Sequence, residues 1–177
     1  YTGTPQWAKA EAACDSVRAM NYSLDADPLA PFITDNDNSA ENIFTIAFDE
    51  NDSDERGEFN LHMRTLHYNS NLTYNMTVGP WNGFAVMEAH YNTYEEADKR
   101  KEGFLVGQQY TYDGKEIIDD GADGANLIFD PFIPALQMDA TNTAVEIRMS
   151  GVRVAKFEIK LGAKQRLSND FPLFRYA

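Results

Sequence analysis

The hydrophobic pattern at the start of the chain is typical of an amphipathic helix. Thr4 is a helix-capping residue type, Pro5 suits a first helical position, and apolar side chains then recur at helical spacing. The apolar stripe consists of Trp7, Ala10, Cys14 and Val17. We expect a helix from Pro5 to near Asn21 whose stripe needs another helix or a sheet to cover it, with Cys14 packed as a small hydrophobe.

Farther along the chain, apolar runs predict short strands between long loops. The strands are expected at residues 42–49, 59–66, 103–112, 145–148 and 152–159, and one short helix is expected at residues 85–94. Residues 25–38 and 113–143 show no periodicity, and a long aperiodic stretch usually serves function or covers a surface. The pattern predicts an α+β segment that is loop-rich, with short strands and few helices.

The last ten residues, SNDFPLFRYA, carry the signals of a helix start. Asn169 and Asp170 are N-cap residue types, and Pro172 suits a first helical turn. We expect a helix that starts at Phe171 and is cut after Ala177, because helices this short are marginal in water. The alternative is a short terminal helix docked on the core. On the first reading the chain is a piece of a longer protein.

Composition and charge exclude some classes of partner. The chain has 177 residues, of which 43% are hydrophobic, and this suits one globular domain. Its 15 basic and 28 acidic residues give a formal charge of −13, which repels a phosphate backbone. Nucleic acid is therefore not an expected partner. The single cysteine cannot form an intrachain disulfide, and no apolar run reaches the length of a membrane span.

Signatures of catalysis and of cofactor binding are absent from the sequence. There is no GxSxG elbow, P-loop or GxGxxG turn, so no cofactor is expected. His62 and His67, in HMRTLH, lack the spacing and the glutamate of a helical zinc pair. Carboxylates are so numerous that their spacing cannot nominate a general acid and base. A glycoside hydrolase is the rival reading, motivated by those carboxylates alone.

One acidic loop raises the question of calcium binding. Asp119, Asp120 and Asp123 offer hard oxygen ligands in the glycine-bearing stretch IIDDGADGAN. Runs of charge are more often solvated faces, so we expect a solvated turn and no change of melting temperature on adding EDTA.

A polar–aromatic loop, YNSNLTYNMTVGPWNG, supplies the candidate ligand-binding residues. Aromatic faces stack on the C–H face of a sugar ring, and asparagine amides hydrogen-bond its hydroxyl groups. The candidates are Trp81, Tyr68 and Tyr74 for stacking, with Asn71 and Asn82 as polar partners. The alternative is that Trp81 plugs the loop onto the core, and the residues alone do not separate the two roles.

Four segments together resemble the SusD/RagB family of outer-membrane nutrient-binding lipoproteins. The strongest is the ending GVRVAKFEIKLGAKQRLSNDFPLFRYA, because in that family a similar segment leads into a helix. The opening YTGTPQWAKAEAACDSVRAMNYSL resembles the last helix of the family's tetratricopeptide-like region. SAENIFTIAFDE and WNGFAVMEAHYNTYEEADKRKEGFLVG follow in family order, the latter through Asn82, Gly83, Tyr94, Asp98 and Arg100. Trp81 is not a fixed family feature, so its role would be specific to this protein.

The resemblance implies a mainly helical fold in which a tetratricopeptide-like superhelix supports a loop-rich region. Residues 1–24 would be the last helix of the superhelix. Residues 25–177 would be the ligand-binding region, incomplete at its C-terminal end. Cut in this way, the 177 residues alone are expected to fold poorly or to aggregate, because their helical stripe lacks partners on both sides.

The same resemblance implies a non-catalytic receptor on the surface of the outer membrane. Relatives bind glycans, or peptides in the RagB branch, and cap a SusC-like TonB-dependent transporter that takes the ligand inward. They are held in the membrane by a lipid anchor. The lipidated cysteine would lie upstream of residue 1, so Cys14 cannot be that residue.

Overall fold

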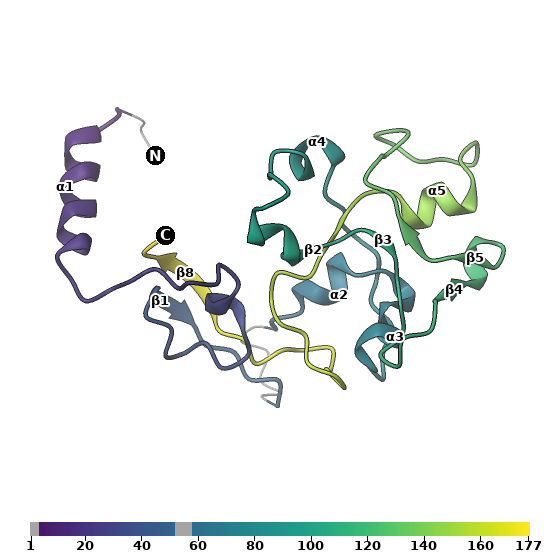
Figure 1. Ribbon diagram of the computed structural model, residues 1–177, viewed down its shortest axis with the longest axis horizontal. Helices are drawn as coiled ribbons and strands as arrows, with labels where there is room; N and C mark the ends of the chain where they lie inside the picture. Colours follow the sequence, from purple (N-terminus) through teal and green to yellow (C-terminus); the bar gives the residue numbers. More distant parts are fainter. Residues whose placement is uncertain (1–3, 52–57) are drawn as a thin grey trace.

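The computed structural model describes residues 4–51 and 58–177, which form an elongated, loop-rich molecule (Figure 1). Its helices are α1 (Trp7–Arg18), α2 (Leu61–Thr65), α3 (Asn71–Tyr74), α4 (Glu88–Tyr91) and α5 (Ala144–Met149). Four 3-10 turns accompany them: η1 (Ala30–Phe32), η2 (Tyr68–Ser70), η3 (Lys99–Gly103) and η4 (Asp120–Ala122). None of these helices is long and apolar enough to cross a membrane.

The strands are short and pair two by two. They are β1 (Asn42–Ile46), β2 (Phe104–Leu105), β3 (Gly107–Gln108), β4 (Ile118–Asp119), β5 (Ala125–Asn126), β6 (Ile128–Phe129), β7 (Arg153–Val154) and β8 (Phe171–Arg175). The pairs β1–β8, β2–β7, β3–β6 and β4–β5 are all antiparallel. This mixture of short helices and strands agrees with the α+β segment predicted from the sequence.

Two small hydrophobic cores hold the loops together. The first, here called the Phe59 core, consists of Phe32, Phe59, Met63, Met76, Phe157, Ala163 and Leu167. The second, the Leu127 core, consists of Ile117, Ala122, Leu127, Phe129 and Met149. Both draw on segments far apart in sequence, so the loops are fixed by long-range packing and not by a large sheet.

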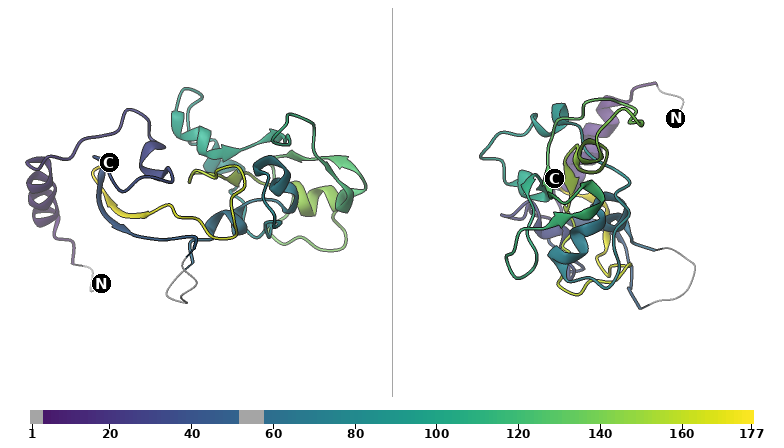
Figure 2. Two further views of the ribbon diagram at one scale, coloured as in Figure 1. Left: turned by 90° about the horizontal axis from the view of Figure 1, so that it is seen from below. Right: turned by 90° about the vertical axis from the view of Figure 1, so that its right-hand side faces the viewer.

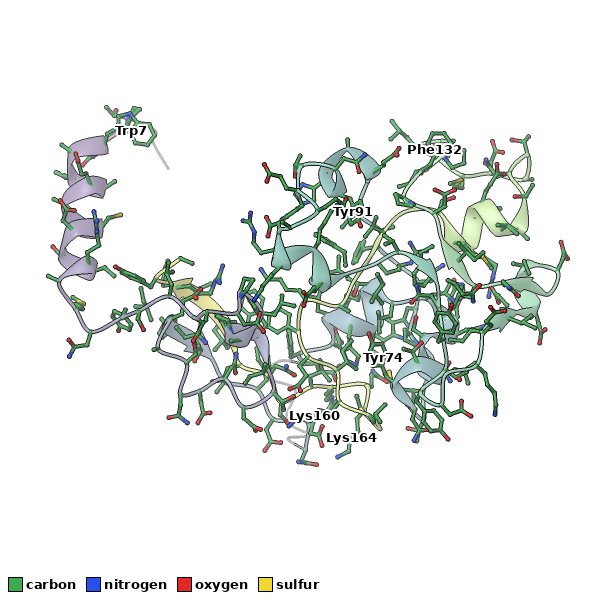
Figure 3. The ribbon with its side chains drawn as sticks, in the orientation of Figure 1. Trp7, Tyr74, Tyr91, Phe132, Lys160 and Lys164 are labelled. Atoms are coloured by element: carbon green, nitrogen blue, oxygen red, sulfur yellow. The ribbon has the colours of Figure 1, made fainter. Side chains whose placement is uncertain are left out.

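The predicted first helix is present as α1, but it stands apart from both cores (Figures 1 and 2). The helix begins after Gln6, which makes no side-chain cap, so the expected Thr4 cap is not used. None of its residues is buried, and Trp7 at its tip is 78% exposed (Figure 3). Cys14 is exposed as well, so its expected packing into a core is wrong for the described chain.

The predicted C-terminal helix is wrong, because residues 171–175 form the strand β8. Phe171 lies opposite Ile46 of β1, and Arg175 lies opposite Asn42. Pro172 is tolerated in β8 because this two-stranded ladder leaves each strand with an open edge, where a missing N–H costs little.

Asn169 and Asp170 do not cap a helix but anchor the strand. The buried Nδ2 of Asn169 donates to the carbonyls of Phe32 and Glu158, at 3.0 and 3.2 Å. The amide of Asn36 donates to the carbonyl of Asp170 at 2.9 Å and accepts from its N–H at 3.0 Å. The same residue types that begin helices therefore fix an extended segment here, because buried backbone groups are available to them.

Two further predicted strands are helices. Residues 59–66 contain α2, whose inward face places Met63 in the Phe59 core. Residues 145–148 lie within α5, which opens with a capping box between Thr143 and Glu146. The Thr-x-x-Glu spacing of such a box is visible in the sequence, and it outweighs the alternation of Val145 and Ile147.

The other predicted helices and strands are present in whole or in part. The strand at residues 42–49 is confirmed as β1, and the short helix at residues 85–94 is confirmed as α4. Residues 103–112 hold β2 and β3, separated before Gly107, whose φ of 71° breaks the extended run. Residues 152–159 keep only the two residues of β7, and residues 113–143 contain the β4–β5 pair and β6 instead of being wholly irregular.

Candidate ligand-binding site

The predicted aromatic loop folds back on itself, and this brings Tyr68 and Trp81 onto neighbouring backbone. The N–H of Trp81 donates to the carbonyl of Met63 at 2.6 Å, which ties the end of the loop to α2. Gly79 packs so closely that a β-carbon there would lie 3.2 Å from the carbonyl oxygen of Tyr68. The tertiary structure thus brings the end of the loop back to its beginning, with the backbone before Trp81 packed against that of Tyr68.

Tyr68 presents a half-exposed ring that is held from within the protein. The ring is 42% exposed, and the guanidinium of Arg148 lies 4.7 Å from its centroid. Arg148 is fixed in turn by Asp119, since its Nε and Nη2 donate to the two carboxylate oxygens at 2.6 and 2.8 Å. A two-pronged bond of this kind fixes orientation as well as distance. The Tyr68 ring is therefore pre-positioned.

Beneath the ring lies a buried polar cluster with unusual acid–base properties. Burial lowers the pKa of His67 to about 4, although the carboxylate of Asp119 acts in the opposite direction. The imidazole is therefore neutral near pH 7, with Nδ1 accepting from the N–H of Asn69 at 3.0 Å and Nε2 lying 3.2 Å from Asp119. Burial alone would raise the pKa of Asp119, but hydrogen bonds from Arg148 reverse this and leave it below its ordinary value.

The acidic loop contributes one carboxylate to this cluster and does not assemble a cation site. Asp119 is buried and bound to Arg148, while Asp120 and Asp123 are exposed. In residues 4–51 and 58–177, no three His, Cys, Asp or Glu side chains converge in a way that would hold a metal ion. The three aspartates thus occupy different environments.

Trp81 offers a second exposed ring. It is 41% exposed, and the guanidinium of Arg64 lies 5.2 Å from its centroid. The next aromatic residue, Phe84, is 60% exposed and donates its N–H to the carbonyl of Arg64 at 2.8 Å. The expected alternative, in which Trp81 plugs the loop onto the core, is thus not the observed arrangement, because much of the ring faces solvent.

The other three candidate residues are engaged within the protein. Tyr74 packs against the Phe59 core, and burial raises its pKa to about 12. Asn82, at a φ of 53°, donates to the carbonyl of Arg148 at 3.0 Å and accepts from Nε of Arg153 at 3.0 Å. Asn71 is half-buried at the start of α3. Ligand contacts by these residues stay predictions, but the geometry gives Tyr74 and Asn82 a structural task.

Two exposed tyrosines beside this loop were not foreseen. Tyr110 and Tyr112 are 48% and 59% exposed, and the N–H of Tyr112 donates to the carbonyl of Leu72 at 2.9 Å. The buried Gln109 before them shows the period of two that turns both rings outward. The alternation in the sequence stretch QYTY was the available signal.

A second site is a cavity of about 380 Å³, here called the Phe32 pocket. It lies between the β1–β8 side of the molecule and the segment that runs from α4 to β2 (Figure 1). Phe32, Tyr94 and Phe104 contribute aromatic walls. The charged lining residues are Asp25, Glu41, Arg100, Lys156 and Arg175. None of the five predicted ligand-binding residues lines this cavity. Its walls come from six separate stretches of the chain, so the sequence alone did not indicate it.

Comparison with solved structures finds a protein with a similar arrangement of helices and strands. A SusD superfamily protein from Parabacteroides distasonis superposes on 96% of this chain with a TM-score of 0.58 and 13% identity. The fold is SusD-like. The chain spans 31% of the length of that protein. No family model matches the sequence, and no curated protein matches it.

Proposed function

We propose that this chain is part of a non-catalytic surface receptor that binds glycans and delivers them to a SusC-like TonB-dependent transporter in the outer membrane. The SusD-like fold and the sequence resemblance both support this proposal. The observation that carries it is the Tyr68 ring, half exposed and backed by Arg148. Trp81, at the other end of the same loop, supplies a second ring.

A fixed aromatic ring is suited to capture without chemistry. A sugar buries its apolar C–H face on the ring and keeps its hydroxyl groups in water. Because Asp119 already holds Arg148, and Arg148 lies on Tyr68, little side-chain freedom is lost when a ligand binds. Affinity gained in this way comes from pre-organisation.

The electrostatics of the cluster support binding over hydrolysis. A glycosidase needs two carboxyl groups about the glycosidic bond, one of them protonated through a raised pKa. Asp119, the buried carboxylate beneath Tyr68, has a lowered pKa and both oxygens bound to Arg148. It is therefore suited to hold a guanidinium and unsuited to donate a proton.

Calorimetric titration of the full-length protein with a panel of polysaccharides tests the proposal. Tyr68→Ala and Trp81→Ala should each weaken binding about tenfold, equivalent to about 1.4 kcal/mol. Phe174→Ala is the matched control, because Phe174 is 61% exposed on β8, which lies well apart from α3 and the adjoining Tyr68 (Figure 1). Equal losses in all three variants would contradict a site at Tyr68.

Two further measurements address catalysis and delivery. Incubation of the same polysaccharides with the purified protein should release no reducing ends, and carboxylate-dependent hydrolysis would overturn the receptor function. Delivery predicts that the intact lipoprotein co-purifies from outer membranes with a TonB-dependent transporter. Binding of peptides and of no glycan would replace the proposal with a RagB-like one.

A further inference from the structure

The Phe32 pocket combines aromatic walls with an uneven distribution of charge. Nζ of Lys156 lies 4.0 Å from the centroid of the Phe32 ring, and the guanidinium of Arg175 lies 4.9 Å from it. Arg100 reaches the same cavity beside Tyr94, with its guanidinium 5.2 Å from that ring. Three cations therefore line one cavity in a chain whose formal charge is −13.

Two of the three cations are neutralised by carboxylates of the protein. Arg175 donates to Glu41 at 2.6 Å, and the second oxygen of the buried Glu41 accepts from the N–H of Asp25 at 3.1 Å. Arg100 forms an ion pair with Asp98. The carboxylate of Asp25, the other acid of the lining, accepts from the hydroxyl of Ser39 at 2.9 Å.

Lys156 is different. In the described part of the chain no carboxylate lies within ion-pair distance of its ammonium, which rests on the Phe32 ring. Burial lowers the pKa of Lys156, and the charges of Arg175 and Arg100 lower it further, with Glu41 acting against them. Lys156 is thus the one cation of the lining, among the described residues, without a carboxylate partner, and solvent can reach it.

We propose that the Phe32 pocket binds a uronic acid residue of the glycan ligand, with the sugar carboxylate paired to Lys156 and the ring lying against Tyr94 and Phe104. An anion placed there pairs with the ammonium that lacks a carboxylate partner, while the aromatic walls match the C–H face of a sugar. The cavity volume of about 380 Å³ falls within the range of small-ligand pockets. This inference rests on the proposed glycan receptor and names its ligand class.

The test compares an oligogalacturonate with its carboxyl-reduced counterpart, which differs only in the carboxylate. Calorimetric titration of the full-length protein should show at least tenfold tighter binding of the acidic oligosaccharide at low salt, and the difference should shrink in 0.5 M NaCl. Lys156→Met should abolish that difference, because methionine keeps the apolar stem and removes the charge. Lys160→Met is the matched control, since Lys160 is exposed and paired with Asp35 (Figure 3).

The outcomes separate this inference from the function on which it rests. If both oligosaccharides bind equally well in the wild type and in Lys156→Met, the uronate pocket is wrong and the glycan receptor stands. Retained binding of the neutral oligosaccharide by Lys156→Met also shows that the variant is folded. If no glycan binds at all, the proposed function fails. If acidic peptides alone bind in a Lys156-dependent manner, the uronate ligand is overturned in favour of a peptide.

Discussion

At the scale of single residues, buried polar side chains form hydrogen bonds with backbone carbonyls that the neighbouring strands of a larger sheet would otherwise bind. Arg153 is 3% exposed and donates to the carbonyls of Arg148, Ser150 and Gly151. Burial lowers its pKa to about 10. Asn169 fixes two further carbonyls from a fully buried position. Buried backbone groups need partners, and in a chain of short strands side chains provide them.

The pKa of His67 makes the stability of the chain depend on pH. The folded value of about 4 lies below the ordinary 6.5, so the unfolded state takes up a proton first as the pH falls. The contribution of the neutral His67 imidazole to the free energy of unfolding is therefore complete above pH 6.5. It is lost as the pH falls from 6.5 to 4, and this loss reaches up to about 3 kcal/mol. Urea unfolding at pH 7.0 and 4.5 should show a smaller loss in His67→Gln than in the wild type.

His90→Gln serves as the control, because His90 is exposed. His62, also buried and with a lowered pKa, adds a part of the slope that remains in both variants. Identical slopes for the wild type and for His67→Gln would contradict the buried neutral imidazole.

Asn169 should be among the most sensitive positions of the chain. Asn169→Ala leaves the buried carbonyls of Phe32 and Glu158 without their donor and releases the start of β8. We expect a loss of about 1–3 kcal/mol in the free energy of unfolding. Urea titration provides the measurement, with Asn92→Ala at an exposed position as the control. Equal midpoints in the two variants would show that the buried amide stabilises nothing.

At the scale of elements, ends and partners decide the structure of each segment more than its own propensity does. The α5 helix has only six residues, and its first turn is held by two reciprocal bonds: Glu146 N–H to the Thr143 hydroxyl at 3.1 Å, and Thr143 N–H to the Glu146 carboxylate at 2.7 Å. This helix carries Arg148, the residue beneath Tyr68. By fixing the start of α5, the cap therefore helps to position Arg148 against the Tyr68 ring.

Removing that cap gives a prediction at this scale. Thr143→Ala should cost about 1 kcal/mol of unfolding free energy, because one N–H of the first turn loses its acceptor. Thr77→Ala, at an exposed position outside any helix or strand, should change it by less than about 0.5 kcal/mol. Chemical denaturation of the two variants compares them directly. A neutral Thr143→Ala would mean that packing of Met149 alone holds α5.

At the scale of the whole molecule, α1 is set apart from two cores that fix the rest of the chain (Figure 2). The stripe on α1 exposes Trp7 and Cys14 to solvent, and Val17 is half-exposed. The β1–β8 pair, by contrast, joins residue 42 to residue 175 and packs Phe171 against the Phe59 core. The buried side chains therefore lie in residues 25–177, while α1 leaves its apolar stripe uncovered in the described chain.

This separation predicts the behaviour of the 177 residues in solution. They should self-associate through the α1 stripe, because exposed apolar area of this kind is buried favourably in contact with a second copy. Deleting residues 1–20 should restore a monomer in gel filtration and leave the melting temperature nearly unchanged, since α1 has no buried residue. A monomeric parent chain, or a large fall in melting temperature on deletion, would contradict it.

The sequence by itself determined the features that depend on local pattern. The 12-residue helix α1 was predictable from its repeated apolar spacing, and β1 from a run of β-branched and aromatic residues. The polar, aperiodic loop nominated Tyr68 and Trp81 as candidates, but the sequence did not decide whether the Trp81 ring is exposed. The SusD-like fold was indicated by motifs in order along the chain, which the superposition bears out for the fold.

Only the tertiary structure decided the segments whose local signals are weak or ambiguous. Residues 171–175 read as a helix start, yet they extend along β1 because Asn36 and buried carbonyls bind Asn169 and Asp170. Segments of five or six residues gain too little from their own hydrogen bonds to fix a conformation, so long-range partners choose it. The Phe32 pocket could not be predicted from the sequence, because residues far apart in the chain line it. Its charged residues, from Asp25 to Arg175, meet only when the chain has folded.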